Sequence, residues 1–177
     1  MRGLWRQVLC CNFHSHEATK PGTLSPDDFV GVIDDILASL GRSSCVLMGK
    51  SWGGRNAVAY SAARPEAVSR LVLSAPAFGM EAADAATLRK LTMPTLLGWS
   101  EDVSRTIVAE TGIAAFSKDP QQQPCGQDTV IPFATHRAYR ENCADLHFCS
   151  YKTGGHLIVA ELLPDLLSFL GKPRAKV

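Results

Sequence analysis

One serine lies in a setting that could make it a nucleophile. Ser51 stands between Gly49 and Gly53 and directly follows the apolar run 45–48 (Cys-Val-Leu-Met). A serine on a sharp turn from a strand into a helix needs small neighbours two residues away on either side, so that strand and helix can approach. Gly49 and Gly53 fill those two places. The segment therefore has the sequence form of a nucleophile elbow.

A nucleophilic serine needs two partners, and the chain offers both residue types. An alcohol attacks a carbonyl carbon only if a neutral imidazole takes its proton, which the imidazole later returns to the leaving group. A carboxylate on the other ring nitrogen selects the tautomer and stabilises the imidazolium. His156 follows a pair of glycines, and Glu101 and Asp102 follow the apolar run 95–99. The chain order is serine, acid, histidine.

The elements around Ser51 have the order that such a turn requires. Ser25 is an N-cap candidate for a helix that Gly41 ends. Apolar residues recur in this helix at helical spacing, which predicts one buried face. That face contains Phe29, Val32, Ile33, Ile36, Leu37 and Leu40. The run 45–48 then reads as a strand, and the alanine-rich segment 55–63 reads as the helix that the turn begins.

The rest of the chain repeats this alternation of strands and helices. Further strands are predicted at 70–74, 95–99 and 145–151, and further helices at 82–91 and 164–170. The last helix is expected to face inward with Leu163, Leu167 and Leu170. This alternation predicts an α/β fold in which helices flank both faces of a mostly parallel sheet. Sites in such sheets form beyond the carboxyl ends of the strands.

On these motifs the chain resembles the α/β-hydrolase fold family, from about Trp5 to Leu170. The anchors are Gly-Lys-Ser-Trp-Gly-Gly at 49–54, Met-Pro-Thr-Leu-Leu-Gly-Trp-Ser-Glu-Asp at 93–102, and Gly-Gly-His at 154–156. The resemblance also implies that lids lie between the strands at 70–74 and 95–99. Only about twenty residues separate these strands, so no cap domain is expected.

The resemblance implies a role for each site residue. Ser51 would be the nucleophile, His156 the general acid and base, and Asp102 the acid that orients the imidazole. The backbone N–H of Trp52 would be one donor to the oxyanion. The Trp52 ring either lines a substrate pocket or packs beneath the elbow. Lys50, where the family often has histidine, either favours an anionic substrate or faces solvent.

The identity of the acid is open among three residues. In the family, a glycine and two variable residues precede the acid, whereas here Ser100 stands in place of that glycine and the acid comes early. Asp102 is favoured over Glu101. Some family members take the acid from the previous strand, and that alternative would point to Glu81.

The beginning of the chain departs from the family pattern. Residues 5–12 align with a middle strand of the usual first half, so the opening strands, the first helix and the loop with the second oxyanion donor have no counterpart. We therefore expect an N-terminally shortened fold, or an oxyanion hole built differently. Missing strands would leave a sheet edge uncovered, which predicts exposed apolar surface, low stability, or a protein partner or homo-oligomer that covers the edge.

Composition limits the remaining function classes. The 177 residues, 46% of them hydrophobic, suit a single domain spanning 1–177, and a net charge of +1 without a basic stripe does not indicate nucleic acid. The six cysteines lack the spacing of metal ligands. Cys45 and Cys149 are expected to be buried in the core of a protein that resides in a reducing compartment. His14 and His16 are expected to be surface residues rather than metal ligands. No membrane span or signal peptide is evident, so a cytoplasmic protein is expected.

The sequence thus predicts a small serine hydrolase without a lid. It would cleave an ester, thioester or amide of a small acyl substrate through a Ser51-His156-Asp102 triad, with no metal or organic cofactor. The alternative is a catalytically weak or inactive relative that keeps the fold as a binding or interaction module.

Overall fold

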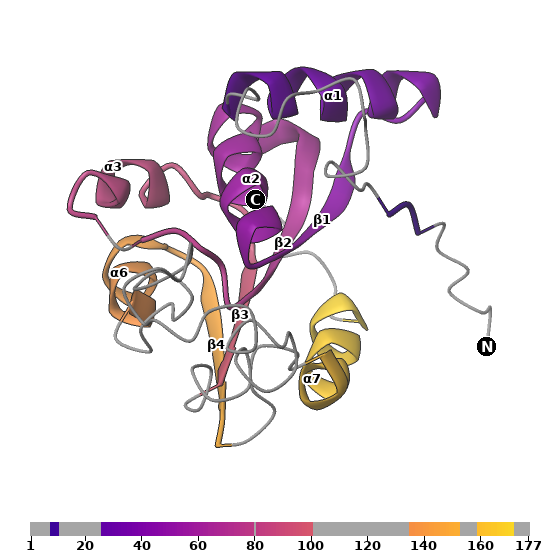
Figure 1. Cartoon of the computed structure of the whole chain (residues 1–177). Helices are drawn as coiled ribbons and strands as arrows, with labels where there is room; N and C mark the ends of the chain where they lie inside the picture. The colour runs from indigo at the N-terminus through magenta and orange to yellow at the C-terminus, as the bar shows by residue number, and fades with distance from the viewer. Residues whose placement is uncertain (1–7, 11–25, 80, 101–134, 153–158, 172–177) are drawn as a thin grey trace, which may run out of the picture.

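The computed structural model describes residues 8–10, 26–79, 81–100, 135–152 and 159–171 of the chain (Figure 1). Its helices are α1 (Pro26–Ser39), α2 (Trp52–Ala63), α3 (Asp84–Leu88), α6 (His136–Asn142) and α7 (Val159–Gly171), with a short 3-10 helix at Pro65–Ala67. Its strands are β1 (Cys45–Lys50), β2 (Val68–Ser74), β3 (Thr95–Ser100) and β4 (Leu146–Tyr151).

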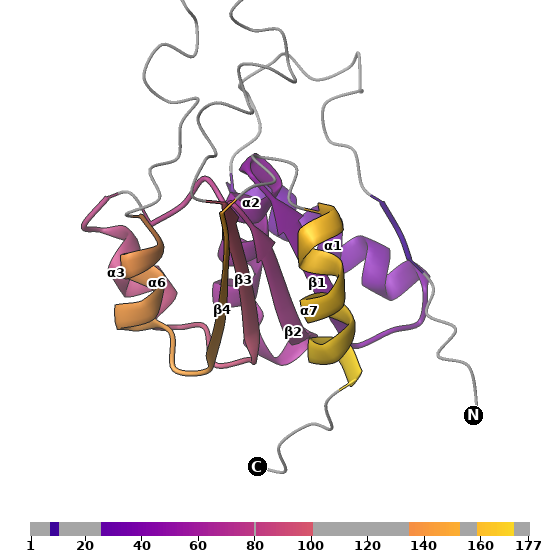
Figure 2. The ribbon, with the colours of Figure 1, turned by 90° about the horizontal axis from the view of Figure 1, so that it is seen from below.

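The four strands form one parallel sheet in the order β1-β2-β3-β4. Helices cover both of its faces, with α7 on one face and α2 on the other (Figures 1 and 2). The predicted parallel α/β architecture is therefore confirmed. Among the described residues between β2 and β3, one short helix, α3, is found, as the length of the connection predicted.

Alternate side chains of each strand enter two separate cores. Leu71, Leu73 and Leu97 join the core that lies against α2, α3 and α6. Val72 and Leu96 join a smaller core with Leu162 and Phe169 of α7. This alternation follows from the two-residue period of a strand, and it identifies the face on which any strand residue lies.

The buried stripe of α7 differs from the predicted one. Leu163 and Leu167, which were expected to face inward, are 48% and 62% exposed, whereas Leu162 and Phe169 are buried. The helix also begins at Val159 rather than at Pro164, which lies inside it. Leucines at five of the nine positions from 162 to 170 are compatible with two neighbouring stripes. The stripe that buries Phe169 removes more apolar area from water.

Two further differences concern the N-terminal half. In α1 the buried residues are Phe29, Val30 and Leu37, while the predicted inward residues Val32 and Leu40 are exposed. Residues 8–10 carry no strand structure and are exposed, so this part of the predicted strand at 5–12 is wrong. The rest of that segment, and the N-cap candidate Ser25, lie outside the described residues.

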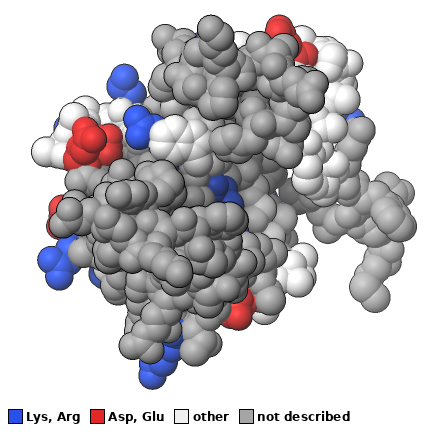
Figure 3. Space-filling view, in the orientation of Figure 1, with Lys and Arg blue, Asp and Glu red and all other residues white. Residues whose placement is uncertain are grey.

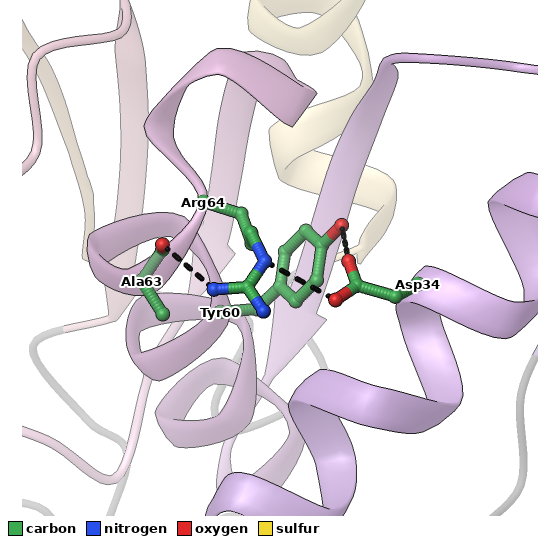
Figure 4. Close-up of polar contacts among 4 residues, drawn as sticks. All are labelled: Asp34, Tyr60, Ala63 and Arg64. Carbon is green, nitrogen blue, oxygen red and sulfur yellow. Dashed lines mark hydrogen bonds and ion pairs between the residues drawn. The ribbon is translucent and has the colours of Figure 1, made fainter.

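A buried tyrosine joins α1 to α2 (Figure 4). The Tyr60 hydroxyl, fully buried on α2, donates to Oδ1 of Asp34 on α1 at 2.9 Å. Arg64 donates from Nε to Oδ2 of the same carboxylate at 3.1 Å. Burial and then the bond to Asp34 raise the pKa of Tyr60, so the phenol stays a donor at all ordinary pH values. Arg64 and Asp34 are both partly exposed, so their ion pair contributes less than the tyrosine bond.

We predict that Tyr60→Phe lowers the free energy of unfolding by about 1 kcal/mol, because it removes one charge-assisted hydrogen bond and no packing. Asp34→Ala should cost more, since it leaves the buried hydroxyl of Tyr60 without an acceptor. Urea denaturation measures both, with Asp35→Ala on the exposed side of α1 as the control. Equal stabilities of the Tyr60 and Asp35 variants would contradict the prediction.

Candidate active site

Ser51 occupies the turn between the end of β1 and the start of α2, and its backbone is strained. Its φ of 50° and ψ of −120° lie in a region that residues with a side chain rarely adopt. Such a conformation costs on the order of 1–3 kcal/mol and persists only where the surroundings enforce it. Ser51 is thus the sharp strand-to-helix turn residue that the sequence predicted.

Four backbone hydrogen bonds hold Ser51 in this conformation. Its N–H donates to the carbonyl of Ser74 at the end of β2, at 3.0 Å. Its carbonyl accepts the N–H of Gly54 at 2.9 Å, of Arg55 at 3.2 Å and of Ala77 at 2.8 Å. Both peptide groups of the serine are therefore satisfied, by the neighbouring strand, the new helix and the loop after β2.

Two glycines near Ser51 lie too close to other backbone or side-chain atoms to carry a Cβ. They are Gly49 and Gly54, whereas the prediction named Gly49 and Gly53. A Cβ on Gly49 would lie 2.5 Å from the Gly53 carbonyl oxygen, and a Cβ on Gly54 would lie 2.6 Å from Cβ of Pro76. A Cβ on Gly53 would meet nothing within 4 Å. The prediction is therefore confirmed for Gly49 and wrong for Gly53. The tight contact falls on Gly54 because α2 passes over the loop after β2.

That loop is itself fixed by a residue far away in the sequence. Ala75 also has a positive φ, of 42°, and donates its N–H to the Gly98 carbonyl at 3.0 Å. Two residues after Pro76, the Phe78 carbonyl accepts the buried hydroxyl of Tyr139 on α6 at 3.0 Å. No sequence pattern predicted α6 or the role of Tyr139, and the run Ser-Ala-Pro-Ala-Phe at 74–78 marks the loop alone.

Trp52 begins α2 and presents its backbone N–H at the helix start. No acceptor for this N–H is found in the described part of the chain, as is usual for the first residues of a helix. Trp52 is 52% exposed, with the guanidinium carbon of Arg55 5.1 Å from the centroid of its ring. Of the two expectations for the ring, packing beneath the elbow is therefore wrong. Lys50 is half-buried at the end of β1.

The other predicted catalytic residues, His156, Asp102 and Glu101, lie outside the described residues, as do His14 and His16. The strands that precede them are placed. β3 and β4 run parallel to β1, so the chain leaves both strands at the sheet edge where Ser51 lies. Glu81, the remaining candidate acid, is exposed and donates its N–H to Asp84 Oδ2 at 3.2 Å.

β4 and α7, the described elements that precede and follow residues 153–158, are joined by a side-chain hydrogen bond. The Tyr151 hydroxyl at the end of β4 donates to Oδ2 of Asp165 on α7 at 2.5 Å. Burial, and then this hydrogen bond, raise the pKa of Tyr151. Nearer the end of α7, the Leu170 carbonyl accepts a hydrogen bond at 3.2 Å from the guanidinium of Arg70 on β2. The helix that follows His156 is thus tied to β4 and to β2.

Other chemistry finds little support in the described residues. Within them, no group of three or more His, Cys, Asp and Glu side chains is arranged to hold a metal ion, and no helix has the length and apolar character of a membrane span. Cys45 and Cys149 are half-buried, less than expected. Burial raises the pKa of Cys143 to about 11, which disfavours the thiolate.

On the face seen in Figure 3, basic and acidic side chains are interspersed over the described surface.

Comparison with known families agrees with the geometry of the elbow. A family model described as serine aminopeptidase, S33, matches residues 23–128, which include Ser51, Trp52 and both acids but not His156. The matched region is more than half of the chain.

Comparison with solved structures shows the same fold. A predicted CIB-like hydrolase from Thermoplasma acidophilum is 19% identical, with a TM-score of 0.64 over 82% of this chain. Carboxylesterase CesB from Bacillus subtilis is 16% identical, with a TM-score of 0.61, over 85% of this chain and 68% of its own. Monoacylglycerol lipase from Paleococcus ferrophilus is 14% identical, with a TM-score of 0.54, over 82% and 76%. The chain spans 59% of the length of the Thermoplasma protein.

We predict that Gly54→Ala unfolds the protein at a lower urea concentration and disturbs the Ser51 turn, because its Cβ would meet Pro76 at 2.6 Å. Gly53→Ala is the matched control one residue away. The added methyl group has no atom within 4 Å and lies in a helix, where alanine is favoured over glycine, so this variant should be more stable by about 0.5–1 kcal/mol. Urea denaturation of both variants measures the difference. The same loss of stability in both would show that close approach is not what selects glycine here.

Proposed function

Because the chain belongs to the serine aminopeptidase S33 family of α/β hydrolases, we propose that it is a serine hydrolase that cleaves a carboxylic ester, thioester or amide through an acyl-enzyme intermediate. The observation that carries this proposal is the strained backbone of Ser51 at the carboxyl edge of a parallel sheet. A strained residue that four hydrogen bonds hold in place is expected where function requires that conformation. The names of similar structures, a carboxylesterase and a lipase among them, agree with this reaction class.

In the proposed reaction, the Ser51 hydroxyl attacks the substrate carbonyl carbon while His156 takes its proton. His156 then gives the proton to the leaving group, and the acyl group remains on Ser51 Oγ. In the second half, His156 takes a proton from water, which attacks the acyl carbon. His156 then returns the proton to Ser51 Oγ as the acyl–oxygen bond breaks, which releases the acid and the free serine. Asp102 holds the imidazole in the required tautomer throughout.

The start of α2 supplies the electrostatic part of the mechanism. The Trp52 N–H would donate to the oxyanion that forms on the substrate carbonyl, and one such donor is worth about 3 kcal/mol of barrier. The positive end of the helix dipole acts in the same direction. The exposed Trp52 ring would then form one wall of the substrate site, beside the Arg55 guanidinium.

The second candidate, a catalytically weak or inactive binding module, is favoured by one feature. In the described part of the chain β1 pairs with β2 alone, and Met48 at this edge is 46% exposed. Leu163 and Leu167 of α7 are exposed as well. An unpaired edge with apolar side chains nearby suits a protein interface.

A fluorophosphonate probe distinguishes the two candidates, because the phosphorus is attacked only by an activated serine, which expels fluoride. We predict that the wild-type protein is labelled and that Ser51→Ala is not, with kcat for a p-nitrophenyl ester reduced by about 10³-fold or more. Ser39→Ala on α1 is the control and should be labelled like the wild type. A folded wild-type protein that takes no label would favour the binding module.

Parallel substitution of the two neighbouring acids assigns the triad carboxylate. We predict that Asp102→Asn lowers kcat by about 10³-fold or more, because the imidazole loses the group that fixes its tautomer. Glu101→Gln, which removes one charge in the same place, should stay within a few-fold of wild type. Steady-state ester hydrolysis measures both. The reverse result would assign the role to Glu101, and full activity of both variants would exclude the pair.

A further inference from the structure

One arginine near the candidate nucleophile lacks the oxygen acceptor that comparable arginines have. Three arginines in the described part of the chain are not exposed, Arg55, Arg64 and Arg70. Arg64 donates to a carboxylate of α1 at 3.1 Å, and Arg70 donates to a carbonyl of α7 at 3.2 Å. The guanidinium of Arg55 has no such acceptor among the described residues. Its contact there is the Trp52 ring, whose centroid lies 5.1 Å from the guanidinium carbon.

The Arg55 side chain lies over the first turn of α2, which begins at Ser51. Trp52 and Arg55 are three residues apart on this helix, so they share one face. Helical side chains lean toward the N-terminus, so Arg55 covers the turn before its own Cα. The contact with the Trp52 ring confirms this direction. The backbone N–H of Arg55 also donates to the Ser51 carbonyl, at 3.2 Å. The guanidinium is therefore placed on the helical turn that carries the candidate nucleophile.

A cation at this position is unfavourable for the helix. The N-terminus of a helix carries partial positive charge, so an acidic residue is the favourable choice there. The first turn of α2 contains no acidic residue. The aromatic ring offsets part of the arginine charge through its π face. The N–H donors of the half-buried guanidinium still lack an oxygen acceptor from the described residues. Conflict with a local rule of this kind is expected at functional sites.

We propose that Arg55 and Trp52 form a subsite that binds a carboxylate group of the substrate, carried by its acyl group or by its leaving group. This inference rests on the proposed function and names its substrate class. A carboxylate only accepts hydrogen bonds, and its two oxygens match the planar fork of a guanidinium in a bidentate pair. The exposed Trp52 ring would hold the guanidinium on one side and cover the apolar part of the substrate on the other.

Two matched pairs of esters test the subsite. The p-nitrophenyl monoester of adipic acid and p-nitrophenyl hexanoate have acyl chains of equal length and differ in the terminal carboxylate. The pair p-acetoxybenzoate and phenyl acetate places the same difference on the leaving group. We expect kcat/KM of the wild-type protein to be about ten-fold higher for the charged member of one pair, which identifies the side that carries the carboxylate. In Arg55→Gln the ratio of charged over neutral kcat/KM should fall to about one.

Two further variants separate recognition from a structural role. Arg55→Lys keeps the charge but loses the fork, so it should retain part of the preference for the charged ester. Arg137→Gln, at an exposed position of α6, removes the same charge elsewhere and should keep the full preference. An equal loss of kcat/KM for both members of a pair in Arg55→Gln would show that Arg55 only holds the Trp52 ring. That result, or a wild-type protein without preference in either pair, overturns the inference and leaves the hydrolase assignment intact.

Binding without catalysis distinguishes failure of this inference from failure of the proposed function. In the Ser51→Ala protein, isothermal titration should show that adipate binds, that neutral adipamide does not, and that Arg55→Gln weakens adipate binding about ten-fold. Adipate binding that does not depend on Arg55 overturns the subsite. If the wild-type protein neither hydrolyses esters nor takes the fluorophosphonate label, while adipate binding depends on Arg55, the proposed function is wrong and the carboxylate subsite stands.

Discussion

The carbonyl group of Ser51 is the constraint on which the arrangement of the site depends. It accepts three N–H groups, from the first turn of α2 and from the loop after β2. These bonds offset a backbone conformation that costs on the order of 1–3 kcal/mol. The glycine at position 54 follows from the same constraint, because its backbone lies so close to Pro76 of that loop that a Cβ would not fit. The main chain of Ser51 is thus held by hydrogen bonds to the protein, while its side chain is half-buried at the carboxyl edge of the sheet.

The support for this turn extends to distant parts of the chain. Tyr139 on α6 binds the Phe78 carbonyl, one residue after the N–H that reaches Ser51. Burial raises the pKa of Tyr139 well above its usual value, so the bond persists over the whole pH range in which a hydrolase operates. On the other face, α7 is tied to β4 through Tyr151 and to β2 through Arg70. Helices on both faces of the sheet are thus joined by side-chain hydrogen bonds to the strands or to the loop after β2.

Sequence patterns predicted β1 to β4 and the turn at Ser51 because these have short-range physical signatures. The run 45–48 and Gly49 report local needs of a buried strand and a tight turn, whereas the strand at 5–12 and the need for glycine at Gly53 were predicted wrongly. The patterns failed where the answer depends on partners distant in sequence. Leucines on α7 fit two stripes, and only Phe169 against the sheet selects between them. The seven residues of α6 are too few and too polar to show a helical period. The triad of Ser51, His156 and Asp102 stays a prediction.

The parallel order of the strands also determines when the elbow can form. Each ladder joins segments that are separated by a complete crossover, so the pairing of β1 with β2 has to close the loop that contains α2. The Ser51 N–H has no acceptor until Ser74 arrives beside it. We therefore expect the positive-φ turn to be acquired after the folding transition state, and substitutions at the elbow to change unfolding rates more than folding rates. Stopped-flow kinetics of the Gly54 variant would report this order directly, and a slowed folding limb would contradict it.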